Sequence, residues 1–139
     1  MKQKTITLTA ADKDGNTKQV EVTLAYCYAT EIAYRDLSGE DITDFMQEAS
    51  VAINGDTPRM PDVKKTIYAI LAAINAYYES KKEEAPVKDT DIMFHCTAQE
   101  LGLALGTVIG LRAQFYALPA GEPEDKPDKG KGGRKRKNA

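Results

Sequence analysis

The fold class of this chain is decided by residues 5–24, TITLTAADKDGNTKQVEVTL. Apolar and polar residues alternate in 5–10 and again in 19–24, with the period of two that is typical of half-buried strands. Between them, DKDGN at 12–16 supplies residue types that tolerate left-handed backbone angles. The stretch predicts a β-hairpin. Its apolar face must pack on other elements, because a two-stranded sheet is at best marginally stable alone.

After the hairpin, from Tyr28 onward, the apolar spacing changes to that of amphipathic helices. Gly39 suits the left-handed position that ends a first helix, and NGDTP at 54–58 ends a second. A third and longer helix is expected after Asp62, a suitable N-cap. The expected apolar faces are Ala29, Ile32, Ala33 and Leu37 in the first helix; Ile42, Phe45, Met46, Ala49 and Ile53 in the second; and Val63, Ile67, Ile70, Leu71, Ile74 and Tyr77 or Tyr78 in the third.

Two further helices are predicted near the end of the ordered part. Residues 90–94 are expected to form a short one. Thr97 and Glu100 have the spacing of a capping box, which predicts a last helix over 98–118. The expected fold is therefore α+β and mainly α, with an N-terminal β-hairpin followed by a bundle of four to five helices. A single domain covers residues 1–119, and residues 120–139 form a disordered charged segment.

Length and composition favour one globular domain. The chain has 139 residues, of which 42% are hydrophobic, and no apolar run approaches the ~18–20 residues that cross a bilayer. Cys27 and Cys96 lie far apart, outside any CxxC pattern, and the first residues do not resemble an export signal. These features predict a cytoplasmic protein.

Charge is distributed unevenly between the two parts. Residues 1–119 hold 12 basic and 17 acidic side chains and carry −5, whereas residues 120–139 hold 7 basic and 4 acidic ones and carry +3. An acidic domain does not attract a phosphate backbone, so nucleic-acid contacts would have to come from the C-terminal segment. Its candidate contact residues are Lys131, Arg134, Lys135, Arg136 and Lys137. A solubilising role is the alternative, because no aromatic residue is interleaved for base stacking.

No pattern in the sequence indicates catalysis. His95 is the single histidine and lies beside Cys96, which offers two ligands where zinc takes three or four. Neighbouring residues on a helix point about 100° apart, so this pair does not form a nucleophile and its base either. We expect no catalytic residue, no cofactor, no metal and no enzymatic activity.

The most unusual pattern is a glycine at every fourth position of the last helix, Gly102, Gly106 and Gly110. Each glycine costs a helix about 1 kcal/mol relative to alanine, so three on one face suggest that another backbone approaches closely. One interpretation is that the hairpin or the long helix of the same molecule fills this face. The other is that a partner helix or subunit packs there, with Tyr68, Tyr77 and Tyr78 as contact residues.

With this order of elements, residues 5–119 resemble the tail assembly chaperones of long-tailed bacteriophages and prophages. The resemblance lies in VEVTL at 20–24, LSGEDI at 37–42, Phe45-Met46 and TIYAILAA at 66–73. It implies a non-catalytic, mostly helical protein that binds the tape-measure protein, and with it the tail-tube protein as a second partner. It also implies self-association and a longer form made by ribosomal frameshifting near the end of the reading frame. The family supplies no motif residues that transfer to single positions.

Two alternatives to the chaperone function remain open at this point. The first is a structural protein of the virion, such as a connector or tail-completion protein. The second is a nucleic-acid-associated protein that acts through residues 120–139.

Overall fold

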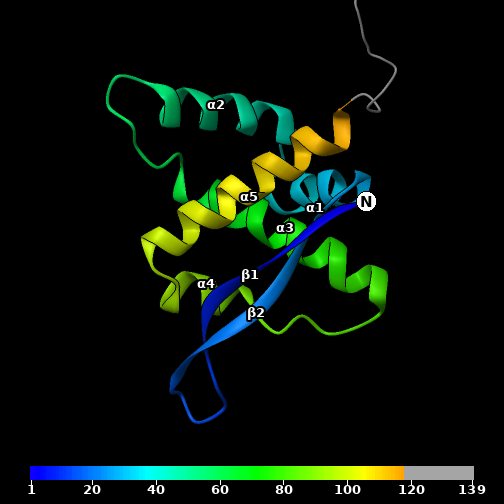
Figure 1. The fold of residues 1–139 in the computed structure, drawn as a ribbon, viewed down its shortest axis with the longest axis vertical. Coiled ribbons are helices and arrows are strands. Elements are labelled where there is room, and N and C mark those ends of the chain that lie inside the picture. The colour runs from blue at the N-terminus through cyan, green and yellow to red at the C-terminus, as the bar shows by residue number, and fades with distance from the viewer. Residues whose placement is uncertain (118–139) are drawn as a thin grey trace, which may run out of the picture.

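The computed structural model describes residues 1–117, which form an antiparallel hairpin followed by five helices (Figure 1). The α+β, mainly helical class predicted from the sequence is confirmed. The predicted last residue of the final helix, Leu118, and the segment 120–139 lie outside the described residues. In chain order the elements are β1 (Lys2–Ala11), β2 (Thr17–Tyr26), α1 (Tyr28–Ser38), α2 (Ile42–Asn54), α3 (Val63–Lys81), α4 (Asp89–His95) and α5 (Ala98–Tyr116).

The hairpin is regular along its whole length, from Lys2 opposite Tyr26 to Ala11 opposite Thr17. In its turn, the Asp12 carboxylate accepts the backbone N–H groups of Asp14 and Asn16 at 2.9 and 3.0 Å. Gly15 has φ 86°, a backbone conformation that residues with a Cβ rarely adopt. The predicted turn residues therefore perform the roles expected of them.

The hydrophobic core lies between the hairpin and α3. On the hairpin, Leu8, Val22 and Leu24 are at most 1% exposed. On α3, all six residues of 69–74 are buried, because β2, α1 and α5 pack against the helix from different sides. Figure 1 shows α3 running behind α5 and the hairpin. The helices thus cover the apolar face that the two strands cannot bury alone.

Helix ends follow the capping residues predicted from the sequence. Asp62 accepts the Lys65 N–H at 2.9 Å at the start of α3. The Thr97 hydroxyl accepts the Glu100 N–H at 3.1 Å, and the Glu100 carboxylate accepts the Thr97 N–H at 3.0 Å, which completes the capping box of α5. At the end of α1, Gly39 has φ 81°.

The predicted apolar face of α1 is wrong except at Ala33, which is partly buried against the core. Ile32 is 62% exposed and Leu37 is 38% exposed, whereas the buried residues of the helix are Thr30 and Tyr34. The Thr30 hydroxyl donates to the Ala25 carbonyl at 2.9 Å, and the Tyr34 ring stacks on Phe45 with 5.7 Å between centroids. Burial of the Tyr34 ring and of the hydrogen-bonded Thr30 hydroxyl stabilises the fold more than burial of the aliphatic side chains would. The helix therefore turns its Thr30 and Tyr34 face toward the core.

Two smaller errors concern the ends of neighbouring helices. In α2, Ala52 is buried in place of Ile53, which is 39% exposed. In α3, Val63 is 55% exposed. Ile53 lies at the end of α2 and Val63 at the start of α3, and both side chains lie outside the core. Ile53 also lines the groove described in the next subsection.

Candidate partner-binding groove

The glycines of α5 face outward. Gly102, Gly106 and Gly110 are all exposed. A Cβ on Gly106 or Gly110 would meet no neighbouring described atom within 4 Å, and one on Gly102 would meet only the Met60 Cε at 4.0 Å. The interpretation that the hairpin or the long helix fills this face is therefore wrong for the described residues. The glycine stripe borders open space.

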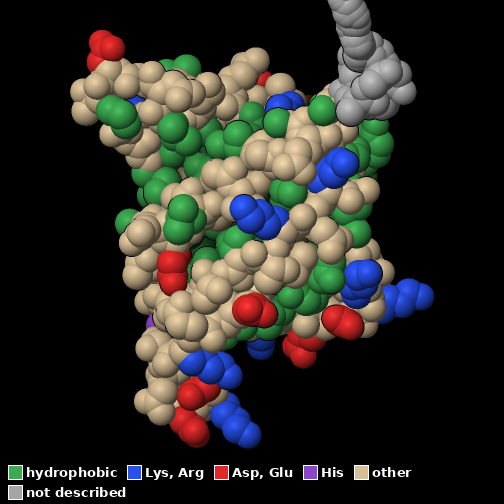
Figure 2. Space-filling view, viewed as in Figure 1, with side chains coloured by type: hydrophobic (Ala, Val, Ile, Leu, Met, Phe, Trp, Pro, Cys, Tyr) green, Lys and Arg blue, Asp and Glu red, His purple; other side chains and the backbone are tan. Residues whose placement is uncertain are grey.

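An apolar groove runs between α2 and α5, and we call it the α2–α5 groove. It consists of two hollows of about 420 and 410 Å³ that share Ile53. Figure 2 shows hydrophobic side chains gathered between these two helices. Its lining residues are Met46, Ser50, Ile53 and Asn54 from α2; Gly102, Leu105, Gly106, Ile109, Arg112 and Ala113 from α5; and Pro58, Arg59, Met60 and Pro61 from the connection between α2 and α3.

A second hollow lies on the other side of the glycine stripe, between β1 and α5. This β1–α5 trough has a volume of about 330 Å³. It is lined by Lys4 of β1 and by Gly102, Leu103, Gly106, Thr107, Gly110, Leu111 and Gln114 of α5. The glycines therefore separate two open surfaces.

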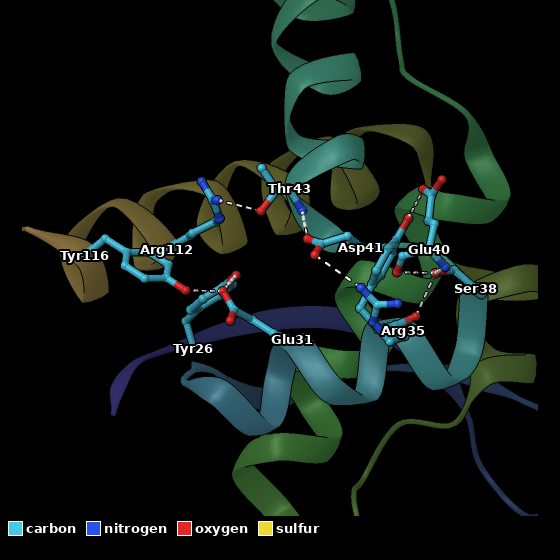
Figure 3. Close-up of polar contacts among 10 residues, drawn as sticks. Tyr26, Glu31, Arg35, Ser38, Glu40, Asp41, Thr43, Arg112 and Tyr116 are labelled. Carbon is cyan, nitrogen blue, oxygen red and sulfur yellow. Dashed lines mark hydrogen bonds and ion pairs between the residues drawn. The ribbon is translucent and has the colours of Figure 1, made fainter.

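Polar contacts connect α1, α2 and α5 at one end of the groove (Figure 3). The Arg112 guanidinium donates to the Thr43 hydroxyl at 3.3 Å, which links α5 to the first turn of α2. It also lies over the Tyr116 ring, 5.4 Å from its centroid. The Arg112 Nε is buried and has no hydrogen-bond partner among the described residues. One more acceptor is needed there to satisfy this donor.

Glu31 organises the neighbouring part of this network. Its carboxylate accepts the hydroxyl of Tyr26 at 2.8 Å and also that of Tyr116. Burial, with the hydrogen bond to Glu31 as second cause, raises the pKa of Tyr26 far above its ordinary value. The hydrogen bond to Glu31 raises the pKa of Tyr116 to about 12. Both phenols stay protonated over the physiological range and hold the end of α5 against β2 and α1.

The three tyrosines predicted as contact residues lie elsewhere, on α3. The Tyr78 hydroxyl accepts the Thr23 N–H at 3.1 Å, and its ring meets Tyr77 edge-on at 4.9 Å. Tyr68 is partly buried against the core. None of them is among the lining residues of the α2–α5 groove or the β1–α5 trough. The structure does not bring these tyrosines together with the glycines.

Of the two chemically reactive candidates, His95 and Cys96, the cysteine makes a structural contact. The Cys96 thiol donates to the Thr9 carbonyl at 3.5 Å, and burial raises its pKa to about 11, so it is not a thiolate at neutral pH. In residues 1–117, no three His, Cys, Asp or Glu side chains are grouped so as to hold a metal ion. Within the same range, no helix has the length and apolar composition to cross a membrane.

The remaining predicted contacts, Lys131, Arg134, Lys135, Arg136 and Lys137, lie outside the described residues. Conversely, the residues that shape the groove most directly were not singled out from the sequence. Ile53 was expected only as a member of the apolar face of its helix, and Ile109 was not considered. The only signal was the glycine stripe beside them.

Comparisons of the chain with known protein families, with curated proteins and with solved structures find no match.

Proposed function

We propose that this protein is a non-catalytic tail assembly chaperone, which binds the tape-measure protein of a long-tailed bacteriophage in the host cytoplasm. An apolar helix of that partner occupies the α2–α5 groove. The observation that carries the proposal is the groove itself, which is open, apolar and bordered by a stripe of exposed glycines. The resemblance of residues 5–119 to this class of chaperones supports the choice of partner.

The shape of the groove suits a helix. Glycines without a Cβ allow a second backbone to approach α5 closely. Met46 and Met60 provide flexible apolar contacts of the kind that adapts to different partner side chains. An amphipathic helix binds such a groove through apolar side chains spaced three and four residues apart.

The charged residues at the groove indicate which side chains flank the apolar stripe of the bound helix. Arg59 lies in one hollow and Arg112 in the other, and no acidic residue of the described part of the chain lines either of them. Carboxylates beside the apolar stripe of the partner would meet these guanidinium groups. The buried Arg112 Nε would then gain the acceptor that it lacks. We therefore expect apolar segments with flanking Asp or Glu to bind best.

The test is co-expression with the tape-measure protein of the same phage, followed by titration with synthetic peptides that cover its apolar helices. Ile53→Asp and Ile109→Asp each place a charge in the groove and remove an apolar contact. The lost burial is worth about 1.5–3 kcal/mol, so peptide affinity is expected to fall about 10- to 100-fold. The tape-measure protein should then become insoluble.

Val51→Asp is the matched control. Val51 lies on the same helix, is 70% exposed and is not among the lining residues of the groove. This variant should bind like the wild type, and circular dichroism should show that all three variants are folded. A tape-measure protein that stays insoluble with the wild-type chain contradicts the proposal. So does equal binding by Ile53→Asp and Val51→Asp.

A further inference from the structure

The outer edge of β1 is open along half of its length. At its far end, Thr9 and Ala11 turn their N–H groups away from β2 and donate to Glu100 at 3.4 Å and to Asp91 at 3.0 Å. Along a strand, alternate residues point their backbone groups to the same side. Gln3, Thr5 and Thr7 therefore also direct their N–H and C=O groups outward. All three are exposed, and these groups have no partner among residues 1–117.

Side chains also cover part of the outer edge of β2, at the opposite end of the hairpin. The Thr23 N–H donates to the Tyr78 hydroxyl at 3.1 Å. Two residues further on, the Ala25 carbonyl accepts the Thr30 hydroxyl at 2.9 Å. Each edge therefore has three open positions among residues 1–117, namely Gln3, Thr5 and Thr7 on β1 and Thr17, Gln19 and Glu21 on β2. The open positions of β1 lie beside the β1–α5 trough, which leaves space for a further strand, so β1 is the edge where we expect one to be added.

We propose that β1 pairs with β1 of a second copy of this chain, antiparallel and centred on Thr5, to form a continuous four-stranded sheet. In this register Thr5 faces Thr5 of the second copy, and Gln3 faces Thr7. All three open positions of β1 then pair with those of the second copy. Both copies contribute the same surface to the interface, as twofold symmetry requires. This inference does not rest on the proposed function.

Charge complementarity favours this arrangement. The first residues of β1 carry Lys2 and Lys4, whereas Glu100 and Asp91 hold the last ones. Antiparallel pairing places Lys2 of the second copy opposite Leu8, next to the Thr9 position where Glu100 binds. Each copy thus brings its basic end to the acidic end of the other. A parallel arrangement would bring like charges together, which is unfavourable.

The β1–α5 trough provides space for the added strand. In the proposed register, Ile6 of the second copy lies opposite Lys4, and both side chains point toward α5. Lys4 lines the trough together with the glycine stripe, so the second Ile6 enters a hollow of about 330 Å³. Ile6 is only half-buried in a single chain. The missing Cβ atoms of α5 therefore leave room for a side chain of the second copy.

Cysteine cross-linking tests the register. With Cys27 and Cys96 replaced by serine, Thr5→Cys places two thiols on the symmetry axis, with Cα atoms about 5.5 Å apart, within disulfide range. Mild oxidation should convert this variant to a covalent dimer. Thr7→Cys is the control, because its two copies are offset by four residues, or roughly 13 Å. Equal cross-linking of both variants, or of neither, overturns the inference.

Proline substitution tests whether the outer edge of β1 forms the interface. The Thr5 N–H points outward, so Thr5→Pro removes a donor from the interface and leaves the ladder to β2 intact. Light scattering should show its molar mass reduced to half of the wild-type value. Glu21→Pro, which removes an outward donor from the edge of β2, should keep the wild-type mass. A wild-type mass equal to one chain, or a dimer that survives Thr5→Pro, overturns the inference.

Discussion

At the scale of single residues, Glu31 connects three elements. It lies on α1, and its carboxylate accepts hydroxyls from Tyr26 at the end of β2 and Tyr116 at the end of α5. Tyr26 is completely buried. A neutral phenol donates to the carboxylate, whereas a phenolate would repel it and would have to be desolvated. The folded state therefore favours the protonated form of Tyr26.

This linkage predicts a loss of stability in alkali. The folded-state pKa of Tyr26 lies far above the ordinary value of 10.0, which applies to the unfolded chain. The stabilisation is fully present below pH 10 and decreases as the pH rises above that value, because the unfolded state then releases the proton first. Urea unfolding should show a steeper decline for the wild type than for Tyr26→Phe. Parallel curves for the two proteins would contradict this account.

The contacts of single residues also show which features could be predicted from the sequence. The caps at Asp62 and Thr97 were predictable because each depends on residues within three positions of each other. The inward face of α1 was not. Its orientation depends on the fit of Tyr34 against Phe45, and no local spacing reveals that contact. Similarly, the contact of Glu31 with Tyr116 spans 85 positions and has no local signal.

At the scale of elements, the groove exists because α2 and α5 separate beyond their contact near Thr43 and Arg112. Figure 1 shows α2 standing above α5, with the connection to α3 closing the far end. The sequence predicted both helices correctly. It could not predict the space between them, which depends on the path of residues 55–62.

Gly106→Ala should separate stability from binding. A Cβ at this position meets no neighbouring described atom within 4 Å, so helix propensity alone decides the effect within the molecule. The free energy of unfolding should rise by about 0.5–1 kcal/mol. Affinity for a tape-measure peptide should fall, because the added methyl group keeps the partner backbone away from α5. Denaturant unfolding and peptide titration measure the two effects.

Gly39→Ala is the control with the opposite sign. Gly39 has φ 81° at the end of α1, so a Cβ is strained there although space is available. The unfolding free energy should fall by more than about 0.5 kcal/mol, with little change in peptide affinity. If Gly106→Ala destabilises the protein in the Thr5→Pro background, which removes the proposed dimer, the stripe is packed within the molecule and not open as described.

At the scale of the whole molecule, two open surfaces lie on either side of the glycine stripe. The α2–α5 groove and the edge of β1 share lining residues only on α5. The sequence analysis expected one partner-binding face and could not resolve two, since their separation depends on how β1 and α2 flank the same helix.

The two surfaces should therefore be separable by mutation. Thr5→Pro is expected to bind tape-measure peptides with wild-type affinity while it behaves as a single chain in solution. Ile53→Asp is expected to lose peptide binding while it keeps the mass of the dimer. Light scattering and peptide titration on the same preparations measure both properties. Loss of both properties in either variant would show that the surfaces are coupled.

The hydrogen bond from the Thr23 N–H to the Tyr78 hydroxyl limits aggregation, because it covers part of the edge of β2. A hairpin with two free edges is a repeating unit that can polymerise, because each added copy presents a new edge to the next. In the proposed dimer, symmetric pairing uses the open positions of β1, and the contact from α3 at Thr23 leaves only Thr17, Gln19 and Glu21 open on β2 within the described residues. Under the proposed pairing, polymerisation is limited, because an added copy could pair only along the three positions of β2 next to the turn.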